Sequence, residues 1–279
     1  VDGDRTYLVT KGPLRDGEGN VIGVFGNSRD ITERKKTEAR ERRISKFYAA
    51  LTECNQAIVH CTSEEELFPQ ICRFAVQYGG MKLARISLLE ADSDVLRTVA
   101  TYGEEIAHLG EVPVSADASN PLGRGGSGTA IREGRPVWVQ DFINDPMTEP
   151  WHERGALEGW RSSAALPLTR NGVTIGALRL YAGERNAFDE EIRQLLVEMA
   201  ADISFALDNF VRESLRQENE KQLRKFSLAI EQSTESIVIT DFDARIEYVN
   251  QAFVQTTGYS REEVIGRNPK LLKIGRAHV

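Results

Sequence analysis

The sequence predicts an α+β fold in which helices cover one face of an antiparallel sheet. Its apolar patterns run in the order helix, helix, two strands, helix, strand, loop, two strands and long helix. The two strands expected over 163–169 and 173–182 flank Asn171-Gly172, a dipeptide that favours a tight antiparallel hairpin. With 279 residues, 41% of them hydrophobic and 28% charged, the chain is long enough for about two domains with apolar cores.

The first elements are a hairpin and a long helix. Strand-like runs over 5–14 and 20–28 flank a turn rich in Asp and Gly. A helix is expected after Asp30-Ile31-Thr32, because Asp or Thr there precedes a run of helix-forming residues. Apolar residues recur along it at alternating spacings of three and four, which is a narrow, coiled-coil-like seam. This seam comprises Ile44, Phe47, Leu51, Cys54, Ile58 and Cys61.

The later elements follow from caps and turn signals. Ser63 and Glu66 match the capping box S-x-x-E and open a second helix. Asp189 caps a last helix, whose seam comprises Ile192, Leu196, Met199, Ile203, Ala206 and Phe210. Between these helices the sequence predicts strands over 82–89, 95–102 and 136–140, a short helix near 128–133, and loops over 103–128 and 141–160.

The two seams predict an assembly. Narrow apolar seams with charged flanks on both terminal helices suit a homodimer that shares a parallel four-helix bundle. The alternative is that both seams pack against the sheet and against each other within one chain.

Three segments resemble known signalling domains. Residues 48–210 resemble a GAF domain, above all in GTAIREGRPVWVQDF and in the stretch that begins WRSSAALPLTRNGVTIGALRLY. Residues 226–273 resemble the N-terminal half of a PAS domain, with Asn250 and the run GRNP in the family's pattern. Residues 1–32 resemble the C-terminal strands of another PAS domain and end in its Asp-Ile-Thr exit.

The resemblance implies a layout of partial PAS folds at both ends of a GAF-like domain. Residues 274–279 fit no PAS continuation and match a translated sequencing adapter, so we expect an artefact tail there. The expected order is 1–32 partial PAS domain, 33–47 helical connector, 48–210 GAF domain, 211–225 helical connector, 226–273 partial PAS domain, and 274–279 tail.

The resemblance also implies a function. PAS and GAF arrays are typical of bacterial histidine kinases and of cyclic-di-GMP cyclases and phosphodiesterases. The chain is therefore expected to be a sensory input module without catalytic residues of its own, relaying a small-molecule or state signal from a GAF pocket through helical linkers to an output domain of an enzyme. One alternative is a catalytic fragment of such an enzyme, although the cyclase, phosphodiesterase, kinase and P-loop motifs are missing from the sequence. Another is a GAF domain that serves only as a structural dimerisation module.

Composition and motifs exclude several other classes. The net charge of −7 argues against nucleic acid, and no apolar run approaches the roughly 20 residues that span a bilayer, so no membrane contact is expected. Three cysteines suit a reducing, cytoplasmic compartment. Cys54 and Cys61 are too far apart for a usual zinc pair, so no metal is expected, and the cofactor is left unknown. The GxGxxG match at 123–128 follows a loop instead of a strand, which favours a helix-capping loop over a dinucleotide site.

Polar side chains in two predicted strands mark a candidate ligand site. Arg85 and Ser87 share one strand face, as do Arg179 and Tyr181, and a charge in a central strand must be paired or solvated. The covering segments would add Trp138, Asp141, Trp151, Trp160 and Arg161. In the alternative interpretation, Arg85 or Arg179 pairs with Asp141 and the tryptophans fill a core.

Overall fold

The structure is a computed structural model that describes residues 5–91, 93–103 and 114–273. Its contacts divide the chain into two compact units, 1–210 and 211–279. The predicted tail at 274–279 lies outside the described residues. Among the helices of the described ranges, none is long and apolar enough to cross a membrane.

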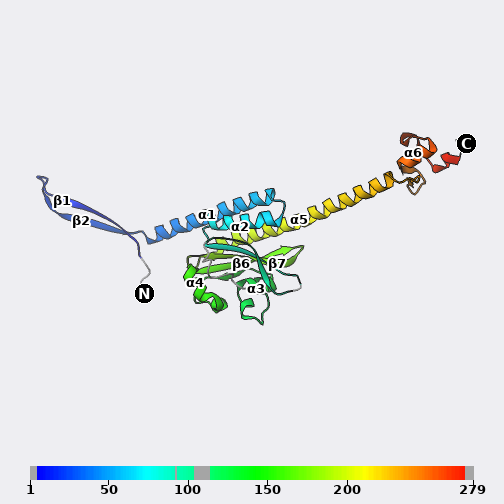
Figure 1. The fold of residues 1–279 in the computed structure, drawn as a ribbon. Helices are drawn as coiled ribbons and strands as arrows, with labels where there is room; N and C mark the ends of the chain where they lie inside the picture. The colour runs from blue at the N-terminus through cyan, green and yellow to red at the C-terminus, as the bar shows by residue number, and fades with distance from the viewer. Residues whose placement is uncertain (1–4, 92, 104–113, 274–279) are drawn as a thin grey trace. The chain divides into compact units, whose positions relative to one another are not determined.

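The first unit is built on a five-stranded antiparallel sheet, which confirms the predicted α+β class (Figure 1). Its strand order is β4-β3-β7-β6-β5. The β6–β7 hairpin turns at Asn171 and Gly172, whose φ angles of 51° and 76° explain why this dipeptide stands there. The strands are β3 Leu83–Leu89, β4 Leu96–Gly103, β5 Val137–Val139, β6 Ser162–Arg170 and β7 Val173–Ala182.

Three helices pack on one face of this sheet: α1 Thr32–His60, α2 Glu64–Gln77 and α5 Glu190–Glu231 (Figure 1). Two predicted caps are present, because Ser63 accepts a hydrogen bond from the Glu66 amide and Asp189 Oδ1 accepts one from the Ile192 amide at 3.1 Å. The helices and the inward-facing strand residues share one large apolar cluster, which includes Leu166, Leu178 and Leu180.

The helical seams are buried inside this cluster. On α1 the buried members are Phe47, Leu51, Cys54 and, at the helix end, Cys61. On α5 they are Ile192, Leu196, Met199, Ile203 and Ala206. The alternative expectation, packing within the chain, therefore accounts for both seams, because residues buried against the sheet are not available to a second chain. The seam residues Ile44, Ile58 and Phe210 are only partly buried.

Short helices cover the opposite face of the sheet. They are η2 Pro121–Gly123, α3 Gly126–Glu133, η3 Pro146–Trp151 and α4 His152–Glu158. The predicted loop over 141–160 is thus partly helical. Asp145 starts η3 by accepting a hydrogen bond from the Met147 amide at 2.9 Å, and Gly159 ends α4 with a φ of 70°.

The N-terminal hairpin pairs β1 Tyr7–Arg15 with β2 Val21–Asp30. Its large apolar side chains are exposed on both faces; they include Val24, which is 73% exposed, and Phe25.

The second unit holds the short strands β8 Val238–Thr240 and β9 Ile246–Val249, the helices α6 Gln251–Thr257 and α7 Arg261–Val264, and η4 Pro269–Lys273. Asn250 is fully buried at its centre. Its Oδ1 accepts hydrogen bonds from the amides of Ile237 at 2.9 Å and Phe253 at 3.0 Å, and its Nδ2 donates to the Glu235 carbonyl at 2.8 Å. One buried amide side chain therefore joins the strand entry to α6.

Candidate ligand-binding site

The two predicted arginines lie side by side on the sheet face that α3 covers. Arg85 of β3 is the direct register partner of Arg179 of β7, and the two are only 4% and 6% exposed. Their register places the two arginines on one face of the sheet. Like charges directly opposite each other in a sheet repel, and burial strengthens that repulsion. This face is therefore costly to assemble without compensating anionic or acceptor groups.

Arg179 is held by two neighbours and keeps one unused donor. Its Nη2 donates to Ser163 Oγ at 2.9 Å, and its guanidinium carbon lies 5.3 Å from the centroid of the Tyr181 ring. Its Nη1 is buried and has no hydrogen-bond acceptor among the described residues. A buried donor without an acceptor is rare and costs free energy of roughly 1–3 kcal/mol, more for a charged group.

Aromatic rings continue the site beyond Tyr181. Trp160 is fully buried and stacks on Tyr181, with ring centroids 4.0 Å apart and planes 29° apart. Phe142 meets Trp160 edge-on at 5.6 Å. The indole Nε1 atoms of Trp151 and Trp160 are buried, and neither has an acceptor in the part of the chain that is described. The tryptophans thus fill a core, as the alternative interpretation expected, but they leave two donors unused.

The glycine-rich segment forms a wall of this site, which the sequence interpretation missed. A β-carbon at Gly126 would lie 1.8 Å from Arg179 Nη1, and one at Gly125 would lie 2.5 Å from the Trp151 ring. Gly126 begins α3, whose N-terminus has no side-chain cap. The start of a helix carries partial positive charge and unshared amide donors. A guanidinium edge beside such a helix start is an arrangement suited to an anion. In the sequence, the signal for this wall is the run of glycines just before α3, because glycines allow the helix start to approach the sheet closely.

Some predicted residues take other places. Trp138 lies on the helix face, where its ring is 5.5 Å from the Arg193 guanidinium, so it does not join the site. Alternation along the short strand β5 turns its neighbours Val137 and Val139 to the site face instead. Ser87 is buried on the site face, and its Oγ lies 3.5 Å from Thr98 Oγ1.

Asp141 and Arg161 make their contacts at the periphery of the candidate site. Asp141 forms an ion pair with Arg185 at 3.4 Å and accepts a hydrogen bond from Asn144 at 2.8 Å. It therefore has partners of its own outside the arginine pair of the strands. Arg161 contributes its backbone, since its amide donates to the Ala182 carbonyl and its carbonyl accepts from the Phe142 amide, both at 2.8 Å.

The cysteines lie on the other side of the sheet. Cys54 and Cys72 are fully buried in the helix-face core, and burial raises the pKa of each thiol to about 12. The pKa of Cys61 is also raised by burial. Within the described ranges, no group of three or more His, Cys, Asp and Glu side chains is placed to hold a metal ion.

Comparison with known proteins identifies the domains. The GAF domain family matches residues 61–208, more than half of the chain, and the PAS fold matches residues 224–274 and 1–36. The chain belongs to the GAF domain family and carries PAS-type segments at both ends.

Among individual proteins, the nitrogen fixation regulatory protein of Klebsiella pneumoniae is 35% identical over 71 residues, which are 25% of this chain and 14% of that protein. The GAF domain of a Coxiella burnetii phosphoenolpyruvate-protein phosphotransferase superposes with a TM-score of 0.51 at 14% identity, covering 62% of this chain and 98% of that one. A free methionine-R-sulfoxide reductase from Neisseria meningitidis, in complex with its substrate, gives 0.50 at 20% identity, covering 60% and 91%. At these identities the two structures show a shared fold.

Proposed function

We propose that this chain is a sensory input module whose GAF domain receives a small anionic molecule at Arg179. The observation that carries the proposal is the buried Nη1 of Arg179, which lacks an acceptor and lies against the uncapped start of α3. A carboxylate or phosphate oxygen there would accept from Nη1 and relieve the repulsion between the two register-paired arginines. The stacked rings of Trp160 and Tyr181 border this point and form its apolar wall.

The sheet itself offers a route for relaying the signal. Along β7, Arg179 faces the site while Leu178 and Leu180 pack into the helix-face core that includes α5. A shift of Arg179 on ligand binding would therefore be felt on the other side of the same strand. Because α5 is one continuous helix from Glu190 to Glu231, it connects that core to the start of the PAS-type segment.

The finer parts of the proposal rest on family resemblance. We place the output domain among cyclic-di-GMP enzymes or histidine kinases, and the chain in the cytoplasm. The similarity to the nitrogen fixation regulatory protein of Klebsiella pneumoniae supports the regulatory role. A homodimer stays part of the proposal, with support from apolar residues exposed on α1 and α5: Tyr48, Val59 and Val197.

The geometry favours binding over catalysis by a cysteine. A thiol enzyme needs a thiolate beside its substrate, whereas the three cysteines here are buried at the helix side with raised pKa values. An assay of the chain for cyclic-di-GMP turnover separates a relay from the catalytic-fragment alternative, and we expect no turnover.

Native mass spectrometry of protein purified from its host without denaturation tests the binding site. The test variant is Arg179→Met, and the matched control is Arg193→Met. Arg193 lies over the ring of Trp138 on the helix face of the sheet, whereas Arg179 lies on the face that α3 covers. We expect the wild-type chain and the control to carry a bound small anion that Arg179→Met lacks. A wild-type chain without added mass, or equal retention by both variants, contradicts the proposal.

A further inference from the structure

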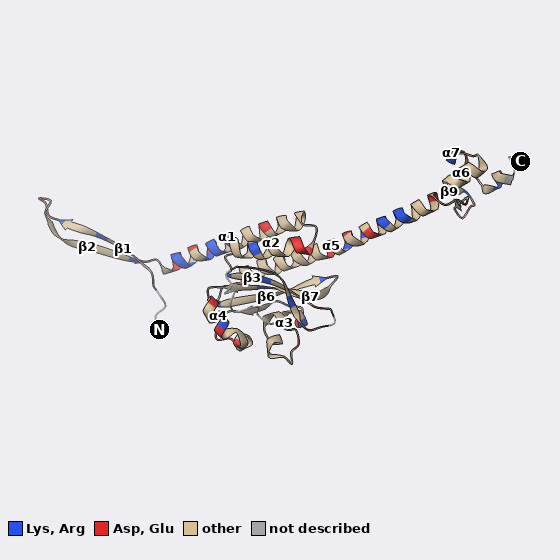
Figure 2. Cartoon of the chain, viewed as in Figure 1, with Lys and Arg blue, Asp and Glu red and all other residues tan. Residues whose placement is uncertain are grey.

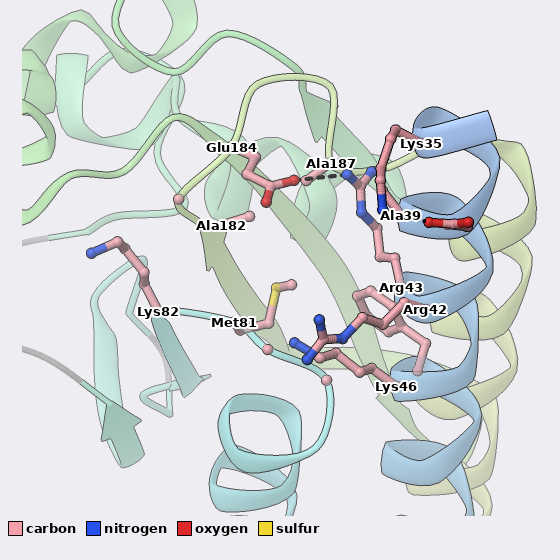
Figure 3. Close-up of a pocket in the computed structure, with 15 residues that line it drawn as sticks. Lys35, Ala39, Arg42, Arg43, Lys46, Met81, Lys82, Ala182, Glu184 and Ala187 are labelled. Atoms are coloured by element: carbon pink, nitrogen blue, oxygen red, sulfur yellow. Dashed lines mark hydrogen bonds and ion pairs between the residues drawn. The ribbon is translucent and has the colours of Figure 1, made fainter. Parts of the chain in front are cut away.

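A cavity of about 850 Å³ opens beside the first half of α1 (Figure 3). Its walls come from α1, from the turn between α2 and β3, and from the segment between β7 and α5. Figure 3 shows basic side chains of α1 extending toward Met81 and Glu184. This cavity is separate from the Arg179 site, and nothing in the proposed sensory function depends on it.

The lining is strongly basic. It holds five basic side chains, Lys35, Arg42, Arg43, Lys46 and Lys82, against the two carboxylates Glu38 and Glu184. Basic residues also cluster along the start of α1 as a whole (Figure 2). The cavity therefore carries a net charge of about +3, although the whole chain is acidic at −7.

Both carboxylates of the lining are already engaged. Glu38 binds Lys35 at 2.8 Å, and Glu184 binds Arg43 at 2.7 Å. For Arg42 and Lys46 no ion pair is present within the described residues. Arg42 and Lys46, which lie one helical turn apart, thus carry positive charge that no described carboxylate balances.

Two basic side chains lie close to glycines of the lining. A β-carbon at Gly80 would lie 3.5 Å from Lys46 Nζ, and one at Gly183 would lie 2.9 Å from Lys82 Cε. Phe47 and Met81 add buried apolar surface to the lining.

We propose that this cavity binds a phosphorylated small molecule of the nucleoside diphosphate class. The planar fork of Arg42 suits two phosphate oxygens and Lys46 supplies a point charge, as phosphate sites require. The volume lies within the range of small-molecule sites, about 300–1,000 Å³, and the apolar part of the lining suits the nucleoside portion. Because the ligand would contact both α1 and the sheet body, its binding would fix the start of α1 on the domain.

Isothermal titration of the full chain with ADP, and separately with inorganic pyrophosphate, tests this site. The test variant is R42Q/K46Q. The matched control is K36Q/R40Q, which removes the same charge from the same helix outside the cavity. We expect saturable ADP binding with a sub-millimolar Kd near physiological salt, weakened roughly tenfold or more in R42Q/K46Q and by about twofold or less in the control. Pyrophosphate should bind more weakly than ADP.

Three results would overturn the proposal: no saturable ADP binding by the wild type, equal weakening in both double variants, or pyrophosphate binding as tight as that of ADP. A measurement on the wild type alone adds an independent check. Saturating ADP should slow amide hydrogen exchange over residues 35–46, and unchanged exchange there would also overturn the proposal.

Discussion

The two faces of the central sheet are equally well buried but differ in chemistry. On β7, Leu178 and Leu180 enter one continuous apolar cluster with the helices, while Arg179 and Tyr181 meet smaller clusters and short helices on the other face. Arg179 is 6% exposed and Leu180 is fully buried. The exposed fraction alone therefore does not distinguish a residue that stabilises the fold from one that binds a ligand. The distinction depends on whether the polar atoms of the side chain have hydrogen-bond partners within the protein.

The physical reason lies in what each side chain gains on folding. A fully buried leucine contributes roughly 1.5–3 kcal/mol through transfer from water. A buried guanidinium loses its free energy of hydration, and only hydrogen bonds or ion pairs within the protein compensate for that loss. Nη1 of Arg179 has no hydrogen-bond acceptor among the described residues. The helix face thus holds the domain together, whereas the other face keeps unused donors.

The largest expected effect is on the helix face. Leu180→Ala should lower the free energy of unfolding by about 3 kcal/mol, because it leaves a cavity in the large core. Urea unfolding followed by circular dichroism measures this change. A loss below about 1 kcal/mol would mean that this face is not the main source of stability.

Cysteine reactivity probes the same core. Cys54 and Cys72 are fully buried and have pKa values near 12, whereas Cys61 is 8% exposed and its Sγ accepts a hydrogen bond from Gln70 at 3.0 Å. With a thiol reagent at about pH 8, Cys61 should react first, and the other two only as the domain opens. Cys61→Ser should remove the fast phase. Three equally fast thiols would show that the core opens readily.

On the site face, Gly126→Ala should have an intermediate effect. The new methyl group would displace the Arg179 guanidinium and lower the free energy of unfolding by about 1–2 kcal/mol. Glu133→Ala at the exposed end of the same helix is the control, with an expected change within about 0.5 kcal/mol. Equal effects in thermal unfolding would show that Arg179 does not depend on the glycine.

The smallest effect is expected outside the sheet. Hydrogen bonds from Tyr248 first, and then from Arg261, lower the pKa of Glu231 below its ordinary value of 4.5. The folded state therefore gains stability from Glu231 above about pH 4.5, and loses it as the pH falls through the lowered pKa. Glu231→Gln should flatten this part of the pH profile of unfolding of residues 211–279. A profile unchanged by the substitution would contradict the assignment.

Local rules predicted much of the fold. Period two placed Arg85 with Ser87 on one strand face and Arg179 with Tyr181 on another, and short-range capping chemistry located the starts of two helices at Ser63 and Asp189. These features depend on neighbours within a few residues, so one sequence is sufficient to find them.

The remainder depends on contacts between distant segments. Residue type alone predicts Trp138 in the site, but the register of β5 turns its side chain to the helix face. Gly126 meets Arg179 only after α3 has packed on the sheet. The basic cavity combines residues near 42, 80 and 183, and no local pattern brings these together.

The most direct test of the central claim, that the α3-covered face serves binding and not stability, is the free energy of unfolding of Arg179→Met measured beside that of Leu180→Ala. The substitution removes one of two register-paired charges together with its unused donor, while keeping apolar volume. The account predicts that Arg179→Met is as stable as the wild type to within about 1 kcal/mol, or more stable. A loss as large as that of Leu180→Ala would contradict it.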